Sequence, residues 1–185
     1  MSDHLNEEQQ NFLLRLAREA IERKLETGET MKAKTSDPLL LAKRGAFVTL
    51  KSGERLRGCI GYPLPYESLA ETIIDSAIMA ATQDYRFEPI TIDELPNIHI
   101  EISVLSRPRP AEDYREVEVG THGIIISKGH NRGLLLPQVP LEYGWNRETY
   151  LGHGCLKAGL DEDEWKKGAK IEIFSAQVFS EPKSA

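Results

Sequence analysis

The sequence Ile98-His99-Ile100-Glu101-Ile102-Ser103-Val104-Leu105 alternates apolar and polar side chains along its length. Side chains two residues apart in a strand point to the same face of a sheet, so aliphatic side chains share one face here. The opposite face carries His99, Glu101 and Ser103. Such a strand is typical of an antiparallel sheet that buries one face in a core and leaves the other polar.

Other segments with the composition of strands lie on both sides of this run. Two pairs of them flank turns that contain glycine, which predicts two hairpins. Their ranges are 46–50 with 55–60 around the turn 51–54, and 123–127 with 133–137 around the turn 128–132. The first hairpin is expected to end at Gly61, ahead of two prolines. Residues 107–110 look extended, and residues 170–179 are expected to form one last strand.

Apolar side chains also recur every three or four residues, which predicts helices. The first runs from about Phe12 to Leu25; Asn6 and Gln9 form a capping-box pattern before it, and Gly28 is placed to end it. Further helical segments are expected at 37–42, 67–83, 146–156 (capped by Asn146) and 161–167 (capped by Asp161).

Hairpins interleaved with helices, without a strand–helix–strand repeat, indicate an α+β fold with a mainly antiparallel sheet flanked by helices. A chain of 185 residues suits a single domain over residues 1–185, alone or with a smaller lobe inserted or appended. No separate second domain is expected.

Charge and apolar content restrict the class of protein. The formal net charge of −6 and the pI of about 5.5 make a nucleic-acid-binding protein the least favoured class, because such proteins usually show a basic surplus. No apolar run approaches the roughly 18 residues of a membrane span. The polar, acidic N-terminal residues lack the pattern of a signal peptide, so Cys59 and Cys155 are expected to be reduced thiols of a cytoplasmic protein.

The run Arg57-Gly58-Cys59-Ile60-Gly61-Tyr62 carries the strongest candidate chemistry. In a regular strand, Arg55, Arg57 and Cys59 point to one face, where two guanidinium charges favour the thiolate, the reactive form of cysteine. Arginine at such a site also binds a carboxylate or phosphate through two hydrogen bonds. Gly58 and Gly61 permit close approach of a ligand or of another backbone. The alternative is a buried cysteine that acts as a small apolar side chain.

Three residues elsewhere are further candidates for the same cleft. Glu101 shares the polar strand face with His99. Three interpretations of this pair are open: a base with its orienting partner, two metal ligands, or an ordinary exposed pair. His122 precedes a predicted strand, either as a general base or as a turn residue that makes local hydrogen bonds. Arg86 lies in a loop and either binds a ligand or caps the preceding helix. No third metal ligand is in view and nucleotide-binding motifs are absent, so no metal and no cofactor is assigned.

Together these motifs resemble the AMMECR-domain family. The run from Arg57 to Gly61 is similar to the family signature, and the resemblance extends over nearly the whole chain. Other matching segments are 84–89, 94–96 with 100–105, 123–124, 135–139 and 144–145. Residues 155–160 resemble the prokaryotic branch, called protein A of the AmmeMemoRadiSam system. One departure is Tyr85, where many relatives carry proline or serine.

The resemblance implies an α+β fold in two unequal lobes, with the signature residues at a cleft. It also implies association with a Memo-like protein and a radical S-adenosylmethionine protein. Two hypotheses follow. The first is an enzyme or enzyme component that uses Cys59 and Arg57 on a small polar or anionic metabolite; the second is a non-catalytic adaptor for a partner of the same system. The residues expected to bind the ligand are Gly58, Ile60, Gly61, Arg86, Glu101, His122 and Gln138.

Overall fold

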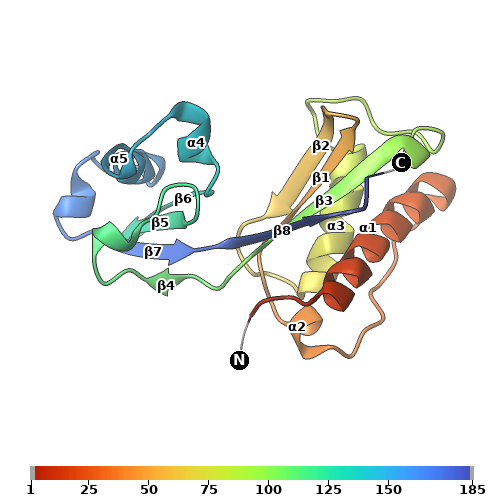
Figure 1. Ribbon diagram of the computed structural model, residues 1–185, viewed down its shortest axis with the longest axis horizontal. Helices are drawn as coiled ribbons and strands as arrows, with labels where there is room; N and C mark the ends of the chain where they lie inside the picture. The colour runs from red at the N-terminus through yellow and green to blue at the C-terminus, as the bar shows by residue number, and fades with distance from the viewer. Residues whose placement is uncertain (1–2, 184–185) are drawn as a thin grey trace. The chain divides into compact units, whose positions relative to one another are not determined.

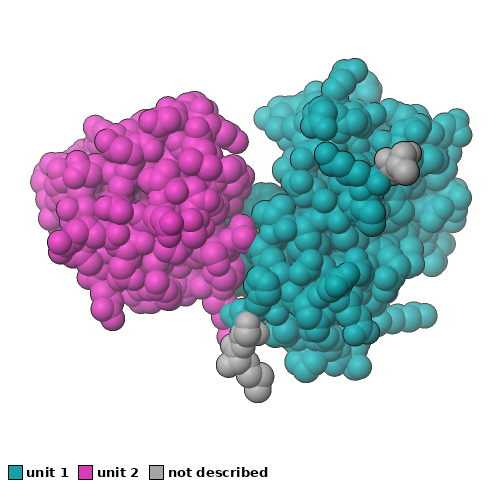
Figure 2. Space-filling view, viewed as in Figure 1, with its two compact units in different colours: residues 1–105, 177–185 teal, residues 106–176 magenta. Residues whose placement is uncertain are grey.

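The computed structural model describes residues 3–183 and divides into two compact units (Figure 2). Unit 1 comprises the chain up to Leu105 and from Gln177 onward, and unit 2 comprises Ser106–Ala176. The predicted α+β fold, with antiparallel sheets in two unequal lobes, is confirmed. None of the helices within residues 3–183 combines the length and apolar character that crossing a bilayer requires.

Unit 1 is built on a four-stranded sheet with the order β2-β1-β3-β8 (Figure 1). The β1–β2 and β1–β3 pairs are antiparallel, and β2 forms one edge. The elements of unit 1 are α1 (Glu7–Thr27), α2 (Pro38–Leu41), β1 (Ala46–Ser52), β2 (Arg55–Tyr62), α3 (Leu69–Thr82), the 3-10 turn η1 (Leu95–Asn97), β3 (Ile98–Leu105) and β8 (Ala176–Ser180).

One face of this sheet packs against α1 and α3. The aliphatic face of β3 is buried, as its alternation predicts, and Ala46, Val48 and Leu50 of β1 are buried beside it. These side chains form one apolar cluster with the buried faces of α1 and α3. The alternate residues of β1, β2 and β3 therefore point to the opposite face, called the open face below.

The first helix begins and ends where its sequence predicts. The side chains of Asn6 and Gln9 each accept a hydrogen bond from the other residue's backbone N–H, at 2.9 Å. Gly28 ends the helix in the left-handed conformation, with φ of 75°, which glycine adopts without steric cost.

Unit 2 holds the second four-stranded sheet, with the order β4-β7-β5-β6. Helix α5 packs on it through Tyr150, Leu151 and Cys155, which are fully buried. The Tyr150 hydroxyl donates toward main-chain carbonyls at 3.1 to 3.2 Å. The elements of unit 2 are β4 (Arg109–Pro110), η2 (Tyr114–Glu116), β5 (Gly123–Lys128), β6 (Asn131–Leu135), α4 (Val139–Tyr143), α5 (Arg147–Lys157), η3 (Glu164–Lys166) and β7 (Lys170–Phe174).

Several boundaries differ from the sequence predictions. The second hairpin turns at residues 129–130, so β6 is Asn131–Leu135 and not 133–137, and α4 was not predicted. Residues 170–179 form two strands, because the chain leaves β7 after Phe174 and continues as β8 in the other sheet. The helix expected at 161–167 is only the 3-10 turn η3, which has no side-chain cap, since so short a segment gains few helical hydrogen bonds. Strand β2 continues through Gly61 to Tyr62, which still pairs with Ala46.

Strand β2 approaches α3 so closely that a side chain at Gly58 has no room. A Cβ added at Gly58 would lie 2.1 Å from the carbonyl oxygen of Ala80. We expect Gly58→Ala to lower the free energy of unfolding by about 1–3 kcal/mol, the usual cost of overpacking. Urea denaturation measures this, with Glu54→Ala in the exposed hairpin turn as a control that should change stability by less than about 0.5 kcal/mol. Equal effects of the two changes would contradict the close-approach explanation.

Candidate functional site

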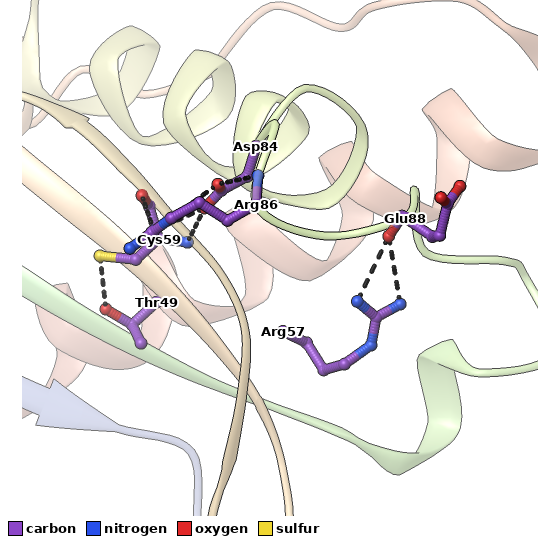
Figure 3. Close-up of polar contacts among 6 residues, drawn as sticks. All are labelled: Thr49, Arg57, Cys59, Asp84, Arg86 and Glu88. Atoms are coloured by element: carbon purple, nitrogen blue, oxygen red, sulfur yellow. Dashed lines mark hydrogen bonds and ion pairs between the residues drawn. The ribbon is translucent and has the colours of Figure 1, made fainter.

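A β-bulge in the β1–β2 hairpin changes the phase of β2 at Arg57. Gly58 and Leu56 lie opposite consecutive residues of β1, so Arg57 between them has no partner across the ladder. The bulge interrupts the two-residue alternation on which the predicted shared face of Arg57 and Cys59 depended. That prediction is wrong. Arg55 lies opposite Ser52, which is in phase with Leu50 and not with Thr49. In Figure 3 the Arg57 guanidinium points toward Glu88, whereas the Cys59 thiol points toward Thr49.

Cys59 instead lies on the open face in a row with residues of β1 and β3. Thr49 lies opposite Cys59 on one side and opposite Glu101 on the other. The Thr49 hydroxyl donates a hydrogen bond to Cys59 Sγ at 3.2 Å. Lys51, two residues along β1 on the same face, places Nζ 3.2 Å from a Glu101 carboxylate oxygen. The row therefore combines the thiol of a partly exposed cysteine, a hydroxyl and an ion pair.

The main chain of Cys59 is held by the pair Asp84 and Arg86 from the loop that follows α3 (Figure 3). The Cys59 N–H donates to Asp84 Oδ2 at 2.9 Å, and Arg86 Nη2 donates to the Cys59 carbonyl at 3.3 Å. Arg86 also binds the same carboxylate, through Nε at 2.9 Å and Nη2 at 2.7 Å. We call this arrangement the Asp84–Arg86 clamp.

The Asp84 carboxylate is charged although its side chain is only 2% exposed. Its pKa lies far below the ordinary range, mainly because Arg86 donates to it and also because the backbone N–H groups of Cys59 and Arg86 do. One alternative from the sequence was that Arg86 caps the preceding helix. That alternative is wrong, because the hydrogen-bond partners of Arg86 are Asp84 and Cys59.

Arg57 is tied to a different part of the same loop. Both of its terminal nitrogens lie 3.3 Å from the Glu88 carbonyl oxygen, and Nη2 lies 3.1 Å from Glu94 Oε1. Glu94 also accepts from the backbone N–H of Thr91, which is the main reason that its pKa is lowered. With these partners, the Arg57 side chain holds the loop against β2.

The glycines and the isoleucine of the signature have packing roles. A Cβ at Gly61 would lie 2.2 Å from the Ala46 carbonyl oxygen, so Gly61, like Gly58, admits another backbone. Neither glycine has a positive φ within the described chain. Ile60 packs against the apolar cluster under the sheet.

The two remaining predicted residues lie in unit 2, outside the row on the open face. The His122 ring accepts a hydrogen bond from the backbone N–H of Glu118 at 3.1 Å, which fits the turn-residue alternative. Gln138 is exposed, and its carbonyl oxygen accepts from the first turn of α4. The site described here is therefore built from unit 1.

Sequence reasoning missed Thr49, Lys51 and Asp84. The first two follow from the hairpin register, which places them on the Cys59 face once the bulge is known. Asp84 begins the segment 84–89 that resembles the family, but that resemblance did not single out its side chain as a site residue. Within residues 3–183, no group of three His, Cys, Asp or Glu side chains is arranged to hold a metal ion.

The Asp84 charge should be visible in the pH dependence of stability. We expect Asp84→Asn to cost about 1.5–3 kcal/mol at neutral pH, the usual value of hydrogen bonds to a charged group. Because the folded pKa of Asp84 is lowered, its stabilisation is complete above the unfolded pKa of about 3.9 and falls as the pH drops below it. Urea denaturation of wild type and variant should therefore show a difference that narrows from about pH 5 to about pH 2.

Asp93→Asn, which alters an exposed carboxylate in the neighbouring loop, is the matched control and should show no such pH-dependent difference. An Asp84→Asn difference that stays constant over the acid range would mean that the Asp84 charge does not stabilise the fold.

Comparisons with known proteins agree with the family resemblance of residues 57–61. Residues 14–179 match the AMMECR1 family model. The chain is 46% identical to a protein from Methanopyrus kandleri, over 98% of this chain and 92% of that protein, and 50% identical to one from Methanosarcina barkeri, over 78% and 74%. The crystal structure of the uncharacterised protein PH0010 from Pyrococcus horikoshii matches with a TM-score of 0.74 and 43% identity, covering 92% of this chain and 90% of that one. The chain belongs to the AMMECR1 family.

Proposed function

We propose that this protein is an enzyme, or a component of one, that acts through Cys59 on a small polar or anionic metabolite at the open face of the unit 1 sheet. The observation that supports this is the placement of Cys59, a partly exposed residue whose thiol accepts a hydrogen bond from Thr49 at 3.2 Å on the open face.

The neighbours of Cys59 supply what a reacting thiol needs. The Thr49 hydroxyl and, next to it, the Lys51 ammonium can stabilise negative charge that develops on sulfur or on a bound substrate. Glu101, in the same row, offers a proton acceptor. The Asp84–Arg86 clamp fixes the main chain on both sides of the Cys59 Cα, so the thiol starts from a defined position.

We also propose that the protein works in the cytoplasm with a Memo-like protein and a radical S-adenosylmethionine protein. The support is the resemblance of residues 155–160 to the prokaryotic branch of the family. A tagged chain that retains neither protein from an extract containing both would argue against this association.

The two thiols of the chain should differ strongly in native reactivity. Cys155 is fully buried, and burial raises the pKa of its thiol, whereas Cys59 is partly exposed. We expect iodoacetamide to modify Cys59 of the folded protein at neutral pH at least about 10-fold faster than Cys155, a difference of about 1.4 kcal/mol in barrier. Mass spectrometry of the two peptides measures both rates.

Thr49→Val is the matched test of the row, because it removes the hydroxyl and keeps the side-chain shape. It should slow the modification of Cys59 and leave that of Cys155 unchanged. If Cys59 reacts only when the protein unfolds, the thiol belongs to the core, the enzyme proposal fails, and the adaptor hypothesis takes its place.

A further inference from the structure

The sequence placed Arg57 beside the Cys59 thiol, but Arg57 binds Glu88 and Glu94, and the arginine that binds the main chain of Cys59 is Arg86. Arg86 Nη2 lies 3.3 Å from the Cys59 carbonyl oxygen, and the guanidinium contacts the ring of Phe87, with Cζ 5.4 Å from the ring centroid. The pKa of Arg86 is raised, mainly by the hydrogen bonds to the Asp84 carboxylate.

One end of this guanidinium remains available. Nε and Nη2 donate to the Asp84 carboxylate, and Nη2 also reaches the Cys59 carbonyl. No residue within 3–183 accepts a hydrogen bond from Nη1, and the Arg86 side chain is 45% exposed. Nη1 carries two N–H donors, so the clamp leaves a fixed donor pair at the edge of β2.

Arg57 differs in this respect. Both of its terminal nitrogens already contact the Glu88 carbonyl, one of them also contacts Glu94, and its side chain is only 16% exposed. An anion that approached Arg57 would have to displace the Glu94 carboxylate, whereas an anion at Arg86 Nη1 would displace no protein group.

We propose that Arg86, held in position by Asp84, anchors an anionic group of the substrate, a carboxylate or a phosphate, beside Cys59. This rests on the proposed function, and it makes the substrate an anionic metabolite. Asp84 is then a positioning residue: it directs Nε and Nη2 inward, so that Nη1 is the end presented to solvent. Only Nη1 is available, so Arg86 offers two N–H groups from one nitrogen to a single oxygen-rich group. A free arginine would instead use two nitrogens to bind the two oxygens of such a group.

The charge selectivity of Cys59 alkylation tests this assignment. Iodoacetate is anionic and iodoacetamide is neutral, but the same thiolate attacks the CH2 carbon of both and displaces iodide. The ionised fraction of the thiol therefore cancels in the ratio of the two rates. We expect the iodoacetate rate divided by the iodoacetamide rate, normalised to the same ratio for free cysteine, to be about 2- to 5-fold higher in wild type than in Arg86→Gln. This is the range of a partly exposed charge pair. Arg55→Gln removes the same charge from an exposed residue of β2 and should leave the ratio unchanged.

Two further variants separate positioning from folding. Arg86→Lys keeps the charge beside Asp84 and should restore part of the ratio. Asp84→Asn keeps Arg86 but frees its guanidinium, and should lower the ratio. In wild type, inorganic phosphate or acetate should slow the iodoacetate reaction at Cys59, and the more effective anion identifies the chemistry of the anchored group.

The outcomes are distinct. A ratio that is equal in wild type and all Arg86 variants overturns the anchor and leaves the proposed function standing. A ratio that falls in Arg57→Gln instead transfers the anchor to Arg57. Failure of both phosphate and acetate to slow the reaction also counts against the anchor. If wild-type Cys59 reacts with neither reagent in the folded protein, the proposed function itself fails.

Discussion

The buried carboxylate of Asp84 is the interaction on which the arrangement of the site depends. Strand β2 is the edge of its sheet, so its outward N–H and C=O groups have no neighbouring strand to bind. At Cys59 the clamp takes that place, with the Asp84 carboxylate as acceptor and the Arg86 guanidinium as donor. A desolvated carboxylate stays charged only where several donors reach it, so the loop after α3 and the edge strand must be positioned together.

The glycines and the bulge follow from the same constraint. Gly58 lets β2 approach the end of α3, where a Cβ would strike the Ala80 carbonyl, and this approach brings the loop within reach of Cys59. The bulge turns Arg57 toward Glu94, where it fastens the far part of that loop. Residues on both sides of Cys59 thus have structural partners, and the thiol itself is directed to the open face beside Thr49.

Much of the fold could be predicted from local pattern, because helix caps and strand alternation are local properties. The box at Asn6 and the alternation of β3 were confirmed. The phase of Arg57 was not predictable, since a bulge depends on packing between strands. The division of residues 170–179 between two sheets was missed for a related reason. The residue between the two strands is Ser175 and not a glycine or proline, so only the tertiary structure separates β7 from β8.

The contrast between the two cysteines bears on what Cys59 is for. Cys155 lies on the inner side of α5 and is fully buried in the apolar cluster of unit 2, as free cysteines usually are. Next to Cys59, Gly58 faces the core and packs against α3. The Cys59 thiol lies on the open face and accepts a hydrogen bond from the Thr49 hydroxyl. Packing alone does not select a thiol at that place, because serine or alanine would fit a half-exposed strand position equally well. A main chain fixed at both its N–H and its carbonyl, together with a side chain left partly exposed, is what a reacting group requires.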